Sequence, residues 1–325
     1  MDAFTPISFN DALERLKAAS EPTRLRLLAL LLECELTVSD LTLILVQSQP
    51  RISRHLKLLC DAGLIDRFPE GAWVYYRLND RGPGVSLVRN LLKDIDPGDP
   101  QLVRDLERLE QIRKSHKEAA NSYFDAAARE WDDIRARHVS EEAVEEAMKA
   151  TFEQETFQNH LDIGTGTGRI IELFSDKTER SLGIDANPRM LSIARNKLAH
   201  DGGRFQVRQA DVYNLSVQSN VIGKNYDLIT IHQVLHYLDD PALALSEIGR
   251  VTAPGGRWLI VDFAPHTLEI LRRDYAHRRL GFSDEQMQGW IESSGLTLSG
   301  VESLEPEEVS GEELTVTIWK ATKPE

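Results

Sequence analysis

The sequence predicts a protein of two domains: a mainly α winged helix-turn-helix domain first, and an α/β domain with a doubly wound parallel sheet second. Three observations support this prediction. A short helix and a basic helix are separated by a turn of about three residues, which is typical of a helix-turn-helix. An alternating hairpin pattern follows them. From residue 159 onward, short apolar runs alternate with helical segments.

The composition is that of an ordinary folded chain. Its 325 residues are 41% hydrophobic and 28% charged, and its longest apolar run is far shorter than the roughly 20 residues needed to span a bilayer. The start shows no charged region followed by an apolar one, so we expect a cytoplasmic protein without membrane contact. Cys34 and Cys60 are more typical of buried thiols than of a disulfide. Without a CxxC pattern or a His/Cys cluster, we expect no metal site.

The first part of the chain is expected to fold into helices and one hairpin. Residues 8–33 predict two helices, a short helix begins near Ser39, and residues 47–49 form the turn before the basic helix. Residues 64–78 alternate around a central "PEG" turn, which predicts a hairpin and, with the preceding helices, a winged helix. A further helix runs to about Lys93.

A linker and a long helix are expected to join the two domains. The segment "DIDPGDP" has the composition of a linker. In the helix after it, four apolar residues share one face, which we expect to pack on a neighbouring domain or subunit: Leu102, Leu106, Leu109 and Ile112. We therefore predict a first domain at 1–95, a linker with long helices at 96–135, and a second domain at 136–325.

Charge is unevenly shared between these parts. The formal net charge is −14, but residues 1–99 hold 12 basic and 14 acidic residues, against 26 and 38 in residues 100–325. The first part therefore repels a polyanion less. Its basic residues concentrate in "SQPRISRHLKLLCDAGL". If Pro50 opens a helix there, an apolar face forms from Ile52, Leu56 and Leu59, and Arg51, Arg54 and Lys57 point largely away from it. This pattern is compatible with DNA binding.

The second part reads as a parallel sheet covered on both faces. Its expected strands are the runs "NHLDI", "SLGID", "FQVRQ", "YDLITI" and "RWLIVDF". The late runs "LTLSGVESL" and "LTVTIWKA" have no helix between them, so they predict an antiparallel hairpin at one edge of the sheet.

A glycine loop lies between the first of these strands and a helix. In "LDIGTGTGRI", the glycines are Gly164, Gly166 and Gly168. A dinucleotide fingerprint starting at Gly164 would need glycine or alanine where this chain has Arg169. The carboxylate of Asp162 would also repel a pyrophosphate, whereas it suits a ligand with an ammonium group. These residues favour S-adenosylmethionine or S-adenosylhomocysteine over NAD.

Acidic residues follow the next two strands. Asp185 is placed where a carboxylate can accept both ribose hydroxyls, and Asp211 where it can accept from an adenine amino group. Ala186, Met190 and Val212 could enclose the adenine ring. Each acid alone could be a surface or capping residue, but three at consecutive strand ends favour the ligand.

Residues 159–262 resemble a class I S-adenosylmethionine-dependent methyltransferase domain. The resemblance rests on "LDIGTGTG", Asp185, Asp211 and the "APGG" turn at 253–256, and it implies a Rossmann-like methyltransferase fold. Residues 120–131 resemble the helix that precedes this fold and covers the methionine end of the ligand, so Tyr123 is a candidate contact, although core packing would explain it equally well.

Residues 18–78 resemble the ArsR/SmtB family of bacterial winged-helix repressors, through "EPTRLRLLALL", "SQPRISRHLKLLCDAGL" and "EGAWVYYRL". The resemblance implies that the basic helix enters the major groove of double-stranded operator DNA and that the protein is a homodimer, with residues 85–93 at the dimer seam. The candidate DNA contacts are Gln49, Arg51, Ser53, Arg54, His55 and Lys57 on the helix, and Arg67 and Arg77 on the wing.

The usual sensor of this family is altered here. Many members bind arsenic or metal ions through the cysteines of a motif of the form ELCVCDL, where this chain has "ELTVSDL" with Thr37 and Ser39. Hydroxyls cannot replace thiolates as ligands of a soft metal. We therefore expect the second domain to provide the control.

Two functions remain open. The chain is either a transcriptional regulator whose methyltransferase-like domain binds S-adenosylhomocysteine or S-adenosylmethionine and modulates operator binding, or an active methyltransferase with a fused regulatory domain. Catalysis with a protic acceptor would need a base. His232 and His236, just beyond the fourth strand, are the candidates, with His277 as a further one; each could also have a capping or core role.

Overall fold

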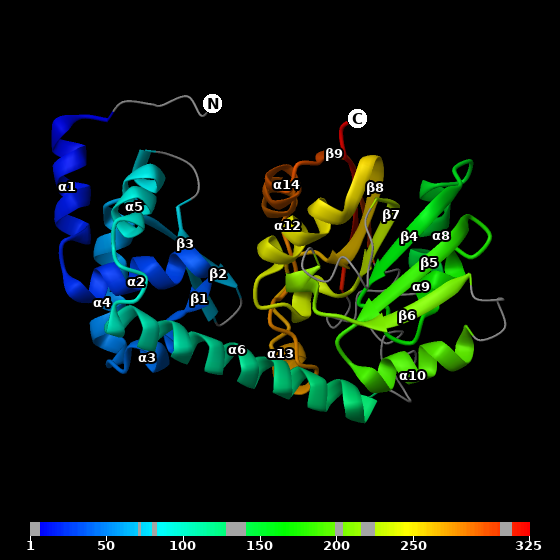
Figure 1. The fold of residues 1–325 in the computed structure, drawn as a ribbon, viewed down its shortest axis with the longest axis horizontal. Helices are drawn as coiled ribbons and strands as arrows, with labels where there is room; N and C mark the ends of the chain where they lie inside the picture. Colours follow the sequence, from blue (N-terminus) through cyan, green and yellow to red (C-terminus); the bar gives the residue numbers. More distant parts are fainter. Residues whose placement is uncertain are drawn as a thin grey trace. The chain divides into compact units, whose positions relative to one another are not determined.

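The computed structural model describes residues 7–70, 73–79, 83–127, 141–198, 204–215, 225–305 and 314–325. The chain divides into two compact units, Met1–Lys117 and Glu118–Glu325, whose elements are labelled in Figure 1. The division falls within the segment 96–135 assigned above to the linker and long helices, and the limits at 95 and 135 themselves stay predictions. In the described part of the chain, no helix is long and apolar enough to cross a membrane.

The N-terminal unit contains the predicted helices and hairpin. Its elements are α1 (Phe9–Ala19), α2 (Pro22–Glu33), β1 (Leu36–Thr37), α3 (Val38–Leu45), α4 (Gln49–Asp61), β2 (Ile65–Glu70), β3 (Trp73–Leu78), α5 (Pro83–Lys93) and the first part of α6 (Pro100–Ala127). β2 and β3 pair antiparallel as the wing. The sequence pattern missed β1, because two residues are too few to show alternation. β1 pairs with β3, so the small sheet has the order β1-β3-β2.

Thr37 and Asp40 fix the start of α3. The Thr37 hydroxyl donates to Oδ2 of Asp40 at 2.7 Å and accepts from the Asp40 backbone N–H at 3.1 Å, while Oδ2 of Asp40 also accepts from the Thr37 backbone N–H. This reciprocal arrangement is a capping box, and both side chains are buried. Thr37 therefore has a structural role in the segment that lacks thiols.

The turn between α3 and α4 contains a strained residue. Val46 ends α3 with φ of 52°, in the left-handed region. This conformation is unusual for a β-branched residue and costs of order 1–3 kcal/mol. The Val46 side chain is 69% exposed, so its packing offsets little of this backbone strain.

α6 begins by packing on the N-terminal unit. Leu109 is buried in the core of this unit and Ile112 packs against that core. Leu106, however, is 39% exposed, so its contact with a neighbouring domain or a partner subunit stays a prediction. The helix turns Asp105 inward instead, where its carboxylate meets the guanidinium of Arg26 on α2 at 2.6 and 2.7 Å.

The C-terminal unit alternates strands and helices as predicted. Its elements are the end of α6, α8 (Glu141–Thr151), β4 (Phe157–Ile163), α9 (Arg169–Leu173), β5 (Thr178–Asp185), α10 (Pro188–Lys197), β6 (Phe205–Gln209), η1 (Val212–Asn214), β7 (Tyr226–His232), η2 (Leu235–Tyr237), α12 (Pro241–Val251), β8 (Thr252–Phe263), α13 (Ile270–Asp274), α14 (Asp284–Ser293), β9 (Thr297–Leu304) and β10 (Val316–Thr322).

The seven strands form one sheet in the order β6-β5-β4-β7-β8-β10-β9. The first five strands of this order pair in parallel, and β10 lies antiparallel to both β8 and β9. The predicted doubly wound sheet with an antiparallel edge hairpin is therefore confirmed. The strand order reverses between β4 and β7, which is the point where ligands bind in open sheets of this kind, beyond the carboxyl ends of the strands.

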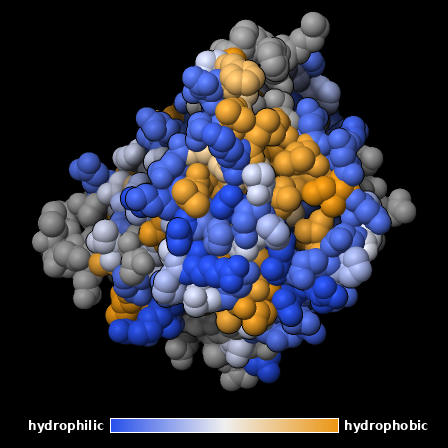
Figure 2. All heavy atoms as spheres, turned by 90° about the vertical axis from the view of Figure 1, so that its left-hand side faces the viewer, coloured by the Kyte–Doolittle hydropathy of each residue, from blue (hydrophilic) through white to orange (hydrophobic). Residues whose placement is uncertain are grey.

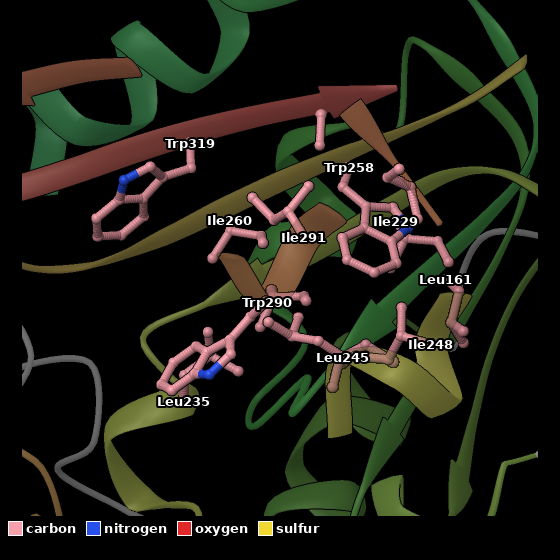
Figure 3. Close-up of a cluster of buried hydrophobic side chains, with 14 of the residues drawn as sticks. Leu161, Ile229, Leu235, Leu245, Ile248, Trp258, Ile260, Trp290, Ile291 and Trp319 are labelled. Atoms are coloured by element: carbon pink, nitrogen blue, oxygen red, sulfur yellow. The ribbon is translucent and has the colours of Figure 1, made fainter. Parts of the chain in front are cut away.

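Apolar side chains hold helices on both faces of this sheet. On one face, Trp258 of β8 packs in a cluster with Leu245 and Ile248 of α12, and Trp290 and Ile291 of α14 belong to the same cluster; Figure 3 shows these side chains converging. On the other face, residues of α8, α9 and α13 pack against β7, β8 and β10. Polar residues lie at the carboxyl ends of β4, β5 and β7, beyond these apolar clusters.

Candidate functional site

α4 separates apolar from basic side chains as the sequence predicts. Ile52, Leu56 and Leu59 are fully buried in the core of the N-terminal unit. The exposed side chains of this helix include those of Gln49, Arg51, Ser53, Arg54 and Lys57. The packing of one face therefore fixes which side of the helix presents its positive charge.

The N-terminal end of α4 is also suited to an anion. Ser48, the residue before the helix, has extended backbone angles, and its side chain makes no capping hydrogen bond. The first turn contains no acidic residue. The N–H groups of Arg51 and Ile52 donate to the Ser48 carbonyl oxygen, so this end offers an anion such as a phosphate mainly the positive end of the helix dipole.

The other predicted DNA contacts lie in different surroundings. His55 faces its own unit: its side chain is only 13% exposed, and its Nδ1 lies 3.5 Å from the Glu21 carboxylate. Burial lowers the pKa of His55, and the positive charges of Arg24, Arg51 and Arg54 act in the same direction. On the wing, Arg67 is exposed, whereas Arg77 is partly buried 3.8 Å from Glu35.

The glycine loop of the C-terminal unit adopts a conformation that favours glycine. Gly164, Gly166 and Gly168 have φ of 65°, 51° and 86°. A Cβ on Gly164 would lie 2.4 Å from the Val234 side chain, so no larger residue fits between the loop and the chain after β7. Arg169, at the start of α9, forms a double hydrogen bond with Glu145 of α8 and does not enter the loop.

Asp185, at the end of β5, ties the loop to the sheet. Its Oδ2 accepts from the Gly166 backbone N–H at 2.9 Å, and its Oδ1 accepts from the Asn187 backbone N–H at 2.7 Å. Burial raises the pKa of this carboxyl, although these backbone donors oppose the shift. A carboxylate has about four acceptor positions. Each oxygen therefore keeps capacity for a ligand hydroxyl.

Asp162 belongs to a buried polar network below the loop. Its Oδ1 accepts the Thr230 hydroxyl at 2.7 Å, and the Thr230 oxygen lies 2.7 Å from Nε2 of His160. Because the Thr230 proton is directed to Asp162, Nε2 of His160 is the donor in that second bond. Burial lowers the pKa of His160 to about 3, so its ring stays neutral. Contact of Asp162 with a ligand ammonium stays a prediction.

The remaining predicted ligand contacts lie on several elements of the C-terminal unit. Asp211 caps η1 by accepting from the Tyr213 backbone N–H. Met190 is buried on α10. Ala186 is exposed, and Val212 is half-buried. Tyr123 lies on α6, but its side chain is outside the described residues. Its neighbour Phe124 packs edge-to-face on Tyr237 of η2, with ring centroids 4.8 Å apart.

The structure distinguishes between the candidate histidines. His232 ends β7 and is 9% exposed. His236, in η2, is 1% exposed, and its Nδ1 lies 2.7 Å from Oδ1 of Asp262 on β8. His277 stacks on His236. The sequence pattern did not single out Asp262; the only available signal was a lone acid ending an apolar strand. Among the described residues, no group of three His, Cys, Asp or Glu side chains is arranged as a metal site.

Comparison with known proteins shows which family the N-terminal unit resembles. Residues 21–67 match the model of the bacterial regulatory protein family named arsR. The arsenical resistance operon repressor of Escherichia coli is 45% identical over 78 residues, which are 24% of this chain and 67% of that protein. The chain belongs to the ArsR family. In this ArsR-family chain, residues 161–260 match a methyltransferase domain model, so a class I methyltransferase domain follows the helix-turn-helix.

The methyltransferase domain has relatives of its own. The ubiquinone/menaquinone biosynthesis C-methyltransferases of Teredinibacter turnerae and Klebsiella pneumoniae are 35% and 34% identical to this ArsR-family chain over 121 and 123 residues, which are 35% and 36% of it. The chain spans about half the length of these relatives, 47% of each.

Solved structures share this fold at low sequence identity. The Burkholderia thailandensis 1,6-didemethyltoxoflavin-N1-methyltransferase, with S-adenosylhomocysteine bound, matches 66% of this chain and 91% of its own, with a TM-score of 0.50 and 17% identity. A methyltransferase complexed with the Haloferax volcanii Trm112 activator matches 62% of this chain and 98% of its own, with a TM-score of 0.50 and 19% identity. These likenesses concern the fold alone.

Proposed function

We propose that this protein is a DNA-binding transcriptional regulator whose methyltransferase domain binds S-adenosylhomocysteine or S-adenosylmethionine and thereby modulates operator binding. The main supporting observation is α4, which presents Arg51, Arg54 and Lys57 on its exposed face and carries no acidic residue in its first turn. This arrangement offers both side chains for base edges and a helix end for a phosphate. Because His55 is turned inward, we leave it out of the proposed interface.

The loop and Asp185 support the adenosyl ligand. The carboxylate already holds the glycine loop in place and keeps acceptor capacity on both oxygens. The fold is that of S-adenosylmethionine-dependent methyltransferases, and the residues present fit the ribose and amino acid parts of such a ligand. Arg169 occupies the position where a dinucleotide fingerprint needs a small residue, and its bond to Glu145 keeps it there.

The segment around Thr37 supports control by this ligand and not by a soft metal. Thr37 and Asp40 use their oxygens on each other to start α3, and no thiol is present in "ELTVSDL". We therefore expect the signal that reaches α4 to come from the methyltransferase domain, for which we propose the adenosyl ligand.

A homodimer is the assembly we propose for operator binding. On α1, the residues Phe9, Leu13 and Leu16 are 82%, 38% and 47% exposed and lie on one side of the helix. Figure 2, which faces the side of the molecule that carries α1, shows apolar side chains gathered among polar ones. A second copy would cover this surface, together with α5, the predicted seam.

The interface on α4 gives a direct prediction. Replacing Arg51 or Arg54 with alanine should weaken operator binding by about 1–3 kcal/mol if the side chain reads a base, and should reduce the salt dependence if it contacts a phosphate. Binding of labelled operator at several salt concentrations measures both effects. Arg104→Ala on α6, which removes an equally exposed charge, is the matched control. Unchanged affinity and an unchanged salt slope in both α4 variants would exclude these residues from the interface.

The coupling between ligand and DNA tests the function as a whole. A ligand moves the DNA equilibrium only by its differential affinity for the two states, and typical couplings of about 1–3 kcal/mol give a 5–150-fold change. We expect both adenosyl compounds to shift the affinity of the dimer for labelled upstream DNA. S-adenosylhomocysteine should act more strongly, because it lacks the methyl group and the sulfonium charge. If neither compound shifts the affinity by more than about twofold, this function is rejected.

An active methyltransferase with a fused regulatory domain is the second candidate function. The pairing of His236 with Asp262 favours it, because a sensor that only binds the ligand does not need a buried, oriented imidazole.

A further inference from the structure

His236 and Asp262 meet at the carboxyl ends of two neighbouring strands. β7 and β8 pair in parallel up to His232 and Val261, so the residues just beyond this pair, including Asp262 near the end of β8, lie at the same edge of the sheet. Gln233, with φ of 53°, redirects the chain from β7 into η2, and Val234 lies against Gly164 of the glycine loop. The imidazole of His236 is therefore two residues from the contact that joins η2 to the glycine loop.

The hydrogen bond to Asp262 determines which nitrogen of the neutral His236 ring carries the proton. Oδ1 of Asp262 lies 2.7 Å from Nδ1 of His236 and also accepts from the Phe263 backbone N–H at 2.9 Å. Because a carboxylate only accepts, a neutral His236 carries its proton on Nδ1 and keeps the lone pair on Nε2. Among the described residues, Nε2 of His236 has no hydrogen-bond partner.

Neighbouring rings hold the imidazole in its plane. The ring of His277 stacks on it with centroids 4.1 Å apart and an angle of 25°, and Tyr237 and Phe263 lie at 4.1 and 5.1 Å. Nδ1 and Nε2 are on opposite sides of an imidazole, so the edge with Nε2 faces away from Asp262. A carboxylate that orients one nitrogen while the other accepts a proton is the arrangement of a general base.

The carboxylate would be costly as a purely structural element. Asp262 is fully buried, and its Oδ2 has no hydrogen-bond partner among the described residues. A buried carboxylate without full hydrogen bonding costs free energy that an apolar side chain at the end of β8 would not. A buried polar atom without a hydrogen-bond partner in a native structure calls for an explanation, and a catalytic role is one.

We propose that His236 accepts the proton of a hydroxyl-bearing methyl acceptor and that Asp262 is its positioning residue. This inference rests on the part of the proposed function that places an adenosyl ligand in the C-terminal unit. A base points to a hydroxyl acceptor, because a neutral hydroxyl oxygen is a weak nucleophile until its proton leaves, whereas a neutral amine already has its lone pair.

S-adenosylmethionine, when bound, supplies an electrophilic methyl group on a positively charged sulfur. The acceptor oxygen forms a bond to the methyl carbon, and the bond between carbon and sulfur breaks with its electron pair passing to sulfur. The acceptor proton passes to Nε2 of His236, and Asp262 stabilises the imidazolium through Nδ1–H. The proton then leaves to solvent, so no other reactant is needed.

The first experiment examines the full chain without any ligand. In ¹⁵N-histidine NMR spectra, we expect His236 to be protonated on Nδ1, with this proton shifted downfield by its bond to Asp262. Asp262→Asn should remove the downfield signal, and Asp274→Asn, which changes an exposed carboxylate of the same unit, should leave it in place. A proton on Nε2 in the unsubstituted chain overturns the proposal.

The second experiment measures methyl transfer from S-adenosylmethionine to catechol and phenol as hydroxyl probes. His236→Gln should lower the rate of methyl transfer by roughly 100-fold or more. Asp262→Asn should change the pH dependence of this rate, whereas Asp274→Asn should leave both the rate and its pH dependence unchanged. Calorimetry with S-adenosylhomocysteine should give affinities for both variants within about twofold of the unsubstituted chain. Transfer that survives in His236→Gln, or no transfer to either probe by a chain that binds the ligand, overturns this inference alone. Failure of the chain to bind the ligand would contradict the proposed function instead.

Discussion

Replacing Asp105 with alanine should lower the free energy of unfolding of the N-terminal unit by about 3–5 kcal/mol, because it leaves a buried charge without its partner. The Asp105 side chain is 3% exposed and that of Arg26 is 16% exposed. Their two hydrogen bonds, of 2.6 and 2.7 Å, join α2 to α6. Gln101 and Arg108 contact the same carboxylate, so alanine at this position disturbs a network of charges and not one bond only.

Hydrogen exchange of the backbone amides of α2 and α4 in the full chain, measured over a series of urea concentrations, measures this change. Glu107→Ala, which removes an exposed carboxylate of the same helix, is the control and should change the free energy of unfolding by less than about 0.5 kcal/mol. Replacing Arg26 and Asp105 together with leucine should cost less than Asp105→Ala alone, since no charge is then left unpaired. Equal effects of Asp105→Ala and Glu107→Ala would contradict this explanation.

The sequence predicted the elements whose side chains repeat with a regular period. The buried face of α4 could be found because Ile52, Leu56 and Leu59 follow the helical repeat. The positions of Asp185 and Asp211 could be predicted because each stands at or just after the end of an apolar strand, and strand ends meet at one edge of a parallel sheet; their contact with a ligand stays a prediction. In both cases, the position of a residue in its own element already determines where its side chain lies.

The residues that the sequence did not reveal depend on partners far away in the chain. Asp105 is one of many charged residues on α6, and only its bond to Arg26, 79 positions earlier, shows that it is turned inward in place of Leu106. Asp262 stands out only through its hydrogen bond to His236, 26 positions earlier. Similarly, His55 belongs to the basic strip by sequence, but its contact with Glu21 turns it inward.

Replacing Asp185 with alanine should weaken S-adenosylmethionine and S-adenosylhomocysteine alike, by roughly 100-fold or more. The two compounds share the ribose, whose hydroxyls would lose a charged acceptor worth about 1.5–3 kcal/mol for each bond, and about 1.4 kcal/mol corresponds to tenfold in affinity. The Gly166 backbone N–H would lose its partner as well, which loosens the glycine loop. Calorimetry with each compound measures the effect, and we expect no binding of NAD to the unsubstituted chain.

Two comparisons make the result specific to the carboxylate of Asp185. Asp176→Ala, in an exposed turn of the same unit, should leave both affinities unchanged. Asp185→Asn keeps the shape of the side chain but not its charge, so its affinities should lie between those of Asp185→Ala and those of the unsubstituted chain. Because burial raises the pKa of Asp185 and only the ionised carboxylate accepts from both hydroxyls, acidification should weaken binding at a higher pH than an ordinary aspartate would allow. Tight binding of NAD, or unsubstituted affinity in Asp185→Ala, would show that the adenosyl ligand has been assigned to the wrong residues.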